Sequence, residues 1–293
     1  MSERAITTEH ATNVHSGTGE DGVIGEILDR LPETDRWCVE FGAWDGLNLS
    51  NTRHLIESRG YAAVLIEADP AKCVELRQNC ADFPRVQAIE AFVGLTETDG
   101  LDALLGDTDV PTDFDVLSID IDGNDYHVWA AVTAYRPKVV CIEFNPTIPT
   151  DLDYVQDPDS GSSAGASLAA IVRLGKEKGY ELAAVTLVNA VLVRADLFAH
   201  LGITDNAAHT LRRDTSLVTH LFTGYDGTVH VAGNTWLPWH ALPMKVGRQA
   251  LPRALRRFPG EYGRGQRLLM TGYHVLRYPR LTVRRLRKHG LPR

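Results

Sequence analysis

Short apolar runs alternate along the chain with segments in which apolar residues recur at helical spacing. The runs end in Gly, Pro or acidic residues, as buried strands do where they leave a sheet. We predict strands at residues 36–42, 61–66, 86–93, 114–121 and 138–144. The helical spacing predicts helices at residues 18–31, 47–58, 71–80, 126–134 and 167–178. Strands that alternate with helices in this way indicate a parallel, doubly wound α/β sheet.

Two further apolar runs, 181–187 and 189–194, follow each other so closely that they predict a hairpin. The expected fold class is therefore a Rossmann-like α/β sheet, mostly parallel, with an antiparallel hairpin at one edge. Residues 151–167 are polar and rich in turn residues, and form a loop long enough to be functional. Farther on, residues 225–231 predict a turn and a strand, whereas 236–240 (WLPWH) fit no element.

Charge is distributed unevenly along the chain. The whole chain has 30 Lys and Arg against 38 Asp and Glu, a net charge of −8. Residues 245–293 hold 14 of the basic residues and a single acid, Glu261, so this segment carries +13 and the preceding part carries −21. We therefore predict an α/β domain over 1–244 and a basic C-terminal tail over 245–293.

The tail mixes basic and apolar residues. A short basic amphipathic helix is expected around the following side chains: Val283, Arg284, Arg285, Leu286, Arg287 and Lys288. Such a helix binds anionic membrane surfaces, or it would dock on the acidic body of the protein. No nucleic-acid motif is present, so nucleic acid is the less favoured partner.

No segment approaches the about 20 apolar residues that a membrane-spanning helix needs. The longest apolar stretch, Leu182 to Leu192, is interrupted by Thr186 and Asn189. The first residues lack the apolar core of a secretory signal. A cytoplasmic protein is expected, with peripheral membrane contact through the tail; the sequence does not give the oligomeric state.

Glu40, Gly42 and Gly46 follow the first predicted strand with the spacing E-x-G-x-x-x-G. Open α/β sheets bind ligands at this position. The glycine spacing of dinucleotide folds is different, and an acid here would repel the pyrophosphate of NAD. It would favour a cation such as the sulfonium and ammonium groups of S-adenosylmethionine. Alternatively, the glycines serve only the backbone of a turn.

Glu67 stands at the end of the second predicted strand, 21 residues after Gly46. An acid at this position accepts hydrogen bonds from ribose hydroxyls. The alternative is a solvated loop acid. Together with Glu40 and the glycines, Glu67 favours a nucleoside-binding βαβ unit.

Five segments in this order resemble FkbM-type S-adenosylmethionine-dependent methyltransferases, and more narrowly a branch with DIDGNDYW-like motifs. They are GEDG (19–22), CVEFGAWDGLNLSNT (38–52), VLIEADP (64–70), LSIDIDGNDYHVW (117–129) and VVCIEFNP (139–146). The resemblance implies a class I methyltransferase fold with seven strands, and methylation of hydroxyls, often on sugars or natural products. His127 stands where Trp is usual, and the tail lies outside the match, so the acceptor is left open. Glu20, in the GEDG segment, would hold the ribose or the ammonium of the cofactor, or it would cap the helix.

Asp120 and Asp122 end the fourth predicted strand, and Glu143 and Asn145 end the fifth. Carboxylate and amide oxygens suit Mg²⁺, and the arrangement is similar to that of catechol O-methyltransferase. The metal would lower the pKa of an acceptor hydroxyl. Without metal, Asp120 would orient cofactor or substrate. His127 would be a general base beside Asp122, or a partly exposed histidine at a helix start.

The leading hypothesis is therefore an S-adenosylmethionine-dependent methyltransferase acting on an oxygen of a small or glycan-like acceptor. Glu40 and the glycines would hold the methionine end, and the carboxylates after the fourth and fifth strands would form the acceptor side. A second hypothesis is a membrane-surface binding protein that kept the fold without turnover. An NAD-dependent enzyme is disfavoured by Glu40.

Overall fold

A computed structural model describes residues 10–244 and 249–280 of the 293-residue chain. The chain divides into two compact units, Met1–Thr215 and Ser216–Arg293. The sequence-predicted boundary at 244/245 was drawn from charge, and the second unit begins earlier than that boundary.

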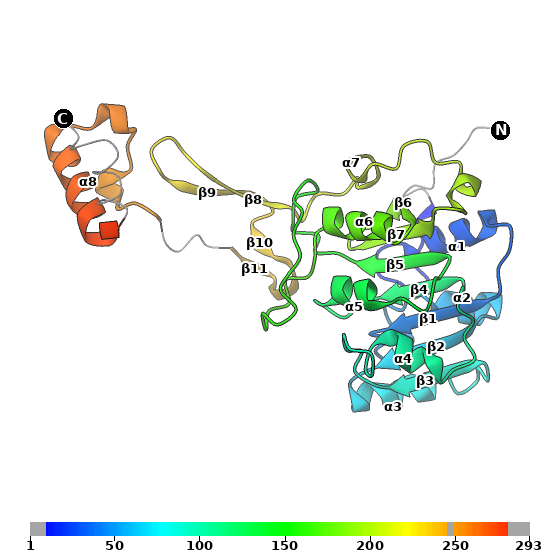
Figure 1. Cartoon of the computed structure of the whole chain (residues 1–293). Coiled ribbons are helices and arrows are strands. Elements are labelled where there is room, and N and C mark those ends of the chain that lie inside the picture. The colour runs from blue at the N-terminus through cyan, green and yellow to red at the C-terminus, as the bar shows by residue number, and fades with distance from the viewer. Residues whose placement is uncertain (1–9, 245–248, 281–293) are drawn as a thin grey trace. The chain divides into compact units, whose positions relative to one another are not determined.

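The first unit is built on a seven-stranded sheet in the order β3-β2-β1-β4-β5-β7-β6 (Figure 1). Its strands are β1 (Trp37–Phe41), β2 (Ala62–Glu67), β3 (Val86–Glu90), β4 (Val116–Ile119), β5 (Val139–Glu143), β6 (Tyr180–Val185) and β7 (Asn189–Arg194). β7 runs antiparallel to both of its neighbours, and the other pairings are parallel. This topology confirms the predicted Rossmann-like sheet and its antiparallel edge hairpin.

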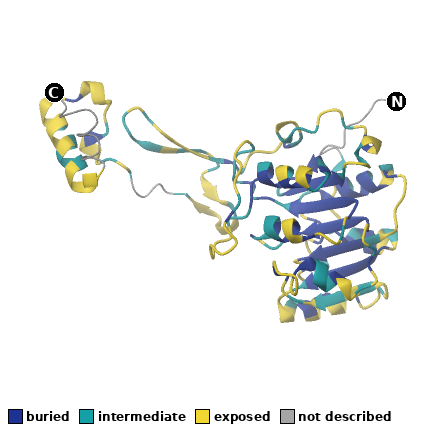
Figure 2. Ribbon diagram, viewed as in Figure 1, coloured by how far each residue is buried: buried dark blue, intermediate teal, exposed yellow. Residues whose placement is uncertain are grey.

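Helices cover both faces of the sheet. They are α1 (Glu20–Arg30), α2 (Arg53–Arg59), α3 (Pro70–Asn79), α4 (Leu101–Gly106), α5 (Asp125–Ala131), α6 (Leu168–Glu177) and α7 (Ala208–Leu211). Successive strand residues face opposite layers, so Cys38 packs with the α1–α3 side and Val39 with the α4–α6 side. Because both faces are covered, the other strands read as apolar runs and are largely buried, whereas the edge strand β3 is only partly buried (Figure 2).

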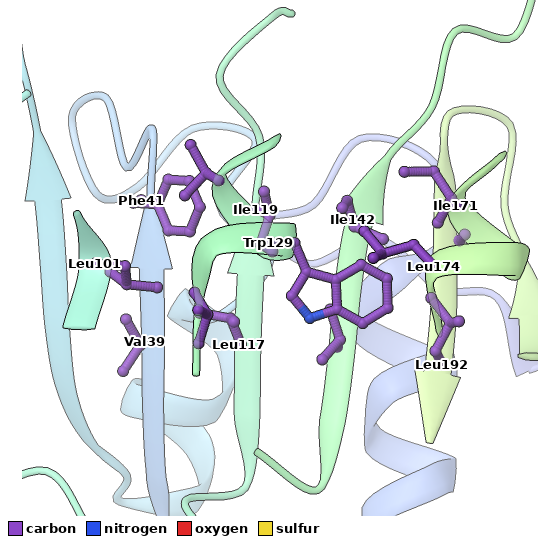
Figure 3. Close-up of a cluster of buried hydrophobic side chains, with 14 of the residues drawn as sticks. Val39, Phe41, Leu101, Leu117, Ile119, Trp129, Ile142, Ile171, Leu174 and Leu192 are labelled. Atoms are coloured by element: carbon purple, nitrogen blue, oxygen red, sulfur yellow. The ribbon is translucent and has the colours of Figure 1, made fainter. Parts of the chain in front are cut away.

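The core on the α4–α6 side centres on Trp129 of α5 (Figure 3). Its indole is almost fully buried and packs at 5.8 Å, edge to face, on the ring of Tyr180. Leu174 of α6 and Ile142 of β5 belong to the same cluster. This packing fixes α5 against the sheet, and thus fixes the turn between β4 and α5 that carries the predicted acidic residues.

Two local predictions differ from the structure. The helix expected from residue 47 begins only at Arg53, because Leu49 has a φ of 60° and the N–H of Asn51 donates to Glu40 in place of a helical carbonyl. The sequence analysis did not predict α4, although Leu101, Leu104 and Leu105 carry helical spacing. Its six residues are too few for a clear periodic signal.

The second unit contains a hairpin of β8 (Thr219–Thr223) and β9 (Val229–Gly233), the short pair β10 (Trp236–Leu237) and β11 (Leu242–Pro243), and helix α8 (Arg264–Arg277). The hairpin confirms the predicted turn and strand at 225–231. The WLPWH segment forms β10 and a turn of 3₁₀ helix. The basic helix expected around 283–288 lies outside the described residues. Within the described ranges, the helices are all too short or too polar to cross a membrane.

Candidate functional site

The carboxyl ends of β1 and β4 form a topological switch point, because the chain leaves β1 toward β2 and β3 and then returns to β4 on its other side. Gly42 follows β1 with φ 73°, and the backbone N–H of Asp120 donates to the carbonyl of Phe41 at 3.3 Å. A Cβ at Gly42 would lie 1.7 Å from the carbonyl oxygen of Asp120. Only glycine fits this approach, so the sequence brings the two strand ends into contact here.

An acidic side chain, Asp45, stabilises the loop after Gly42. Asp45 Oδ1 accepts hydrogen bonds from the backbone N–H groups of Leu47 and Asn48 at 3.0 and 2.8 Å. Gly46 has φ 68°, and a Cβ there would lie 2.3 Å from Leu76 Cδ1. The second predicted glycine is therefore required by the turn and by close packing on α3.

Glu40 lies beneath this loop and is 4% exposed. Its carboxylate accepts hydrogen bonds from Ser50 Oγ (2.6 Å), Asn51 N (2.8 Å) and Thr52 Oγ1 (2.6 Å). Burial raises the pKa of Glu40, and these hydrogen bonds oppose the rise. The structure thus places Glu40 as an anchor of residues 50–52. That Glu40 contacts the methionine end of a cofactor stays a prediction. An effect of Glu40 on cofactor binding would act through the loop at residues 50–52.

Glu67 ties the ends of β1 and β2 together. Its Oε2 accepts from Trp44 N at 2.8 Å, and its Oε1 accepts from Asp69 N at 2.7 Å. A carboxylate has about four acceptor positions, so each oxygen keeps capacity for a ligand hydroxyl. Trp44, with φ 46°, is 43% exposed, and Lys72 Nζ lies 4.6 Å from its ring centre.

An exposed aromatic residue next to β3 escaped the sequence analysis. Glu67 pairs with Glu90 in the β2–β3 register, and Phe92 follows two residues later with 73% of its surface exposed. An apolar ring at the carboxyl edge, near a fixed carboxylate, suits the face of a nucleobase. The run 86–93 was interpreted as a strand throughout, which hid this position.

Three of the predicted metal ligands come together. Carboxylate oxygens of Asp120, Asp122 and Glu143 all lie within 4.8 Å of one another. Burial, together with the charges of Asp125 and Asp122, raises the pKa of Asp120 to about 7. Burial and the neighbouring Asp120 raise the pKa of Glu143 to about 9. Each of these two carboxyls therefore holds its proton more tightly than a free carboxyl does, because burial and the neighbouring negative charges disfavour its ionised form.

The side-chain amide of Asn145, the fourth predicted ligand, forms hydrogen bonds within the loop after β5. Its Nδ2 donates to the carbonyl of Ala164 at 2.9 Å, while its Oδ1 accepts from Thr147 N (2.9 Å) and Thr147 Oγ1 (2.7 Å). These bonds close the loop that follows β5. Both acceptor positions of the amide oxygen are then used, so metal ligation by Asn145 would require this turn to open.

The carboxylate trio fits a small divalent cation. Carboxylate oxygens are the ligands that Mg²⁺ prefers, and one oxygen each of Asp120, Asp122 and Glu143 lies within 4.8 Å of the other two. The raised pKa values reflect mutual repulsion in addition to burial, which a cation would relieve.

Asp125, which the sequence analysis passed over, shapes the acidic turn. Its Oδ1 accepts from Ile121 N at 2.8 Å and its Oδ2 from Gly123 N at 2.9 Å. These bonds fix Asp122 between them at φ 55°. The residue lies in the DIDGNDYHVW segment, so it was within the recognised motif but had no assigned role.

His127 contacts the loop after β5. Its Nε2 lies 2.8 Å from the carbonyl oxygen of Gln156, which only accepts, so Nε2 carries a proton and donates. The Gln156 side chain accepts from Ala164 N and Gly165 N and donates to Asn124 Oδ1 at 2.7 Å. His127 and Gln156 together latch the loop onto the acidic turn. If His127 acts as a base, the atom that accepts the proton is therefore Nδ1.

Glu20 and Asp21 occupy the first turn of α1. Glu20 accepts from Thr18 N (2.8 Å), Thr18 Oγ1, Thr186 Oγ1 (2.6 Å) and Asn189 Nδ2 (3.1 Å), and so links α1 to the β6–β7 turn. Asn189 pairs with Glu143 in the sheet. The Glu20 carboxylate therefore has little capacity left to accept hydrogen bonds from a ligand. Its contribution to cofactor binding stays a prediction.

Asp21 was not predicted, although it belongs to the GEDG segment. Its Oδ2 accepts from three successive N–H groups, those of Val14, His15 and Ser16, each at 2.8 Å. Among the described residues, Oδ1 of Asp21 is buried and has no hydrogen-bond partner. Asp21 thus folds residues 14–16 over the N-terminus of α1 and adds to the negative potential that raises the pKa of Glu40.

No protein-family model and no curated protein matches the chain. Among solved structures, the N-terminal domain of EvdMO1 with SAH bound aligns at 11% identity over 61% of this chain and 82% of that chain, with a TM-score of 0.42. The mitomycin 7-O-methyltransferase MmcR aligns at 14% identity over 58% of this chain and 52% of that chain (TM-score 0.34). Precorrin-6y C5,15-methyltransferase from Geobacter metallireducens GS-15 aligns at 19% identity over 66% and 100% (TM-score 0.37). These scores are too low to assign a function, so the FkbM resemblance stays a prediction.

Proposed function

We propose that this protein is an S-adenosylmethionine-dependent methyltransferase that methylates an oxygen of a small or glycan-like acceptor. The observation that carries the proposal is a group of acidic side chains at the carboxyl ends of the strands around the switch point, with Glu67 beside the glycine turn and three clustered carboxylates after β4 and β5. A nucleoside that carries positive charge suits this arrangement.

This edge of the sheet is unsuited to a dinucleotide. Pyrophosphates bind where a helix N-terminus directly follows the glycine turn, whereas α2 begins at Arg53, seven residues after Gly46. Asp120, Asp122 and Glu143 would repel an anion at short range. The sulfonium and ammonium groups of S-adenosylmethionine would instead be attracted, as would its ribose hydroxyls to Glu67.

In the proposed reaction, the acceptor oxygen attacks the methyl carbon as the carbon–sulfur bond breaks, and S-adenosylhomocysteine leaves. The hydroxyl proton passes to a carboxylate. Asp120 is the candidate base, because its pKa of about 7 lets it accept a proton near neutral pH. Asp122 would orient the acceptor. Rate acceleration would come mainly from holding donor and acceptor in line.

Mg²⁺ is a candidate cofactor at the same carboxylates. Asp120, Asp122 and Glu143 would hold it, and when bound it would lower the pKa of an acceptor hydroxyl. The carboxylates position the acceptor in either case. Activity with a chelator, compared with activity in Mg²⁺, separates the two versions of the proposal.

The first experiment is calorimetric titration with S-adenosylmethionine, S-adenosylhomocysteine and NADH. Glu67→Gln should weaken binding of both S-adenosyl ligands by about tenfold or more, since a charge-assisted hydrogen bond is lost. Glu33→Gln, at an exposed acid before the amino end of β1 and therefore at the opposite edge of the sheet, is the matched control and should leave both affinities unchanged. Tight NADH binding, or no binding of either S-adenosyl ligand, would overturn the proposal.

A further inference from the structure

Helix α8 of the second unit has one face fixed by its own segment. Gln266 Nε2 donates to the carbonyl of Ala254 at 3.1 Å, and Tyr273 Oη donates to the carbonyl of Ala250 at 2.7 Å. Leu255 is buried in the same unit. These contacts orient the helix on residues 250–255 and determine which side chains face outward.

The outward face of α8 is apolar. Leu268 is 76% exposed and Leu276 is 84% exposed, and Leu269 and Val275 lie beside them, also exposed. Positions seven and eight apart stand two turns along one side of a helix, so these four side chains form a single stripe. We call it the α8 stripe. Figure 2 shows most of this helix exposed.

The surroundings of the α8 stripe are strongly basic. Residues 249–280 contain one acid, Glu261, and seven arginines. These are Arg253, Arg256, Arg257, Arg264, Arg267, Arg277 and Arg280. Arg264 and Arg277 stand at the two ends of the helix, one on each side of the stripe. Apolar anchors thus lie between cationic groups, as in helices that rest in the plane of an anionic membrane surface.

We propose that α8 binds an anionic lipid surface, with the α8 stripe inserted among the acyl chains and the arginines against lipid headgroups. This inference goes beyond the methyltransferase proposal and does not depend on it. At 14 residues the helix is about 21 Å long, too short to span a bilayer. It is also a different segment from the basic helix expected around 283–288.

Other occupants fit the surface less well. Nucleic-acid backbones are recognised by cationic and polar groups, which leaves four exposed apolar side chains unexplained. A stable dimer interface needs about 20 residues from each partner, and the α8 stripe offers four. A lipid surface uses both the apolar stripe and the arginines that flank it.

The test is sedimentation of the full chain with vesicles of phosphatidylcholine, alone or mixed with phosphatidylserine. Leu268→Ser/Leu276→Ser removes anchors and keeps the charge, whereas Arg264→Gln/Arg277→Gln removes charge and keeps the anchors. Leu95→Ser, at an exposed leucine of the first unit, is the matched control. Circular dichroism of each variant checks that the fold is retained.

Binding to the mixed vesicles is expected, with little binding to phosphatidylcholine alone and loss at high salt. The arginine variant should partition about thirty-fold more weakly, at about 1 kcal/mol per basic residue. The leucine variant should lose binding as well, and the control should bind like the wild type. Equal binding by the wild type and the leucine variant would overturn the proposal. So would a dimer that the leucine variant dissociates, or DNA binding in the absence of vesicle binding.

Discussion

Replacing Glu143 by Gln should stabilise the protein increasingly as the pH rises. The pKa of Glu143 is raised from 4.5 in the unfolded chain to about 9, by burial first and by the charge of Asp120 second. Between these two values the folded state binds a proton that the unfolded state has lost. Stability therefore falls as the pH rises through this window. Gln is neutral throughout and nearly the same size, so the variant avoids the loss.

One proton held only by the folded state changes the free energy of unfolding by about 1.4 kcal/mol per pH unit. From about pH 5 to about pH 8 the wild type should therefore lose up to about 4 kcal/mol relative to Glu143→Gln. This is a large part of the about 5–15 kcal/mol that holds a typical domain together. Asp120, whose pKa of about 7 is raised in the same way, adds to the slope at the lower end of the range.

The assay is urea unfolding at a series of pH values, followed by the fluorescence of buried Trp129 and the other tryptophans, with chelator in every buffer. Glu97→Gln, at an exposed acid, corrects for the general effect of removing one charge. The electrostatic reasoning fails if wild type and Glu143→Gln show parallel stability curves, or if the wild type becomes more stable between about pH 5 and about pH 8. Adding Mg²⁺ should flatten the wild-type curve if the trio binds it.

Three further predictions address other parts of the site. Gly42→Ala should destabilise the protein by about 3 kcal/mol or more, because its Cβ would meet the carbonyl of Asp120; Gly106→Ala, with open space around it, is the control in urea unfolding. Gln156→Ala should raise the KM for the acceptor while the Kd of S-adenosylmethionine changes little, since Gln156 joins the loop after β5 to the acidic turn on the proposed acceptor side; equal effects on both would contradict this. Asp122→Asn should lower the affinity for S-adenosylmethionine more than for S-adenosylhomocysteine, which lacks the sulfonium charge; paired calorimetric titrations measure the difference, and an unchanged ratio would speak against a cation site.

The sequence predicted the sheet well because its strands are buried on both faces. Such strands appear as apolar runs whichever face each residue joins, as Cys38 and Val39 illustrate. The start of α2 was misplaced for a different reason. Residues 47–52 have helical spacing, but Leu49 has a φ of 60° and the N–H of Asn51 donates to Glu40, eleven residues earlier in the chain. Such a hydrogen bond leaves no periodic signal in the sequence.

Some features of the candidate site could be predicted from the sequence, and others could not. Glu67, Asp120, Asp122 and Glu143 were found from their places at strand ends, because parallel strands bring those ends to one edge. The hydrogen bonds that Glu40 and Asn145 form within the chain could not be predicted from the sequence. Their partners lie on loops whose conformation the sequence does not encode locally. Predicting that an acid is present at a strand end is therefore easier than predicting which of its oxygens remains available.

The clustered carboxyls of Asp120, Asp122 and Glu143 lower the stability of the fold, and this points to a function for them. Asp120 and Glu143 repel each other across a short distance while largely buried, and their raised pKa values lower the stability of the fold at neutral pH. Asp115 shows the alternative within the same sheet, because its buried carboxylate is paired with Lys138 at 2.7 Å. In the described part of the chain, Asp120, Asp122 and Glu143 form no salt bridge of this kind, and carboxyls with perturbed pKa values concentrate at active sites. The cluster of carboxyls at the switch point therefore favours a ligand that lets them ionise, as a cationic methyl donor or a bound metal would.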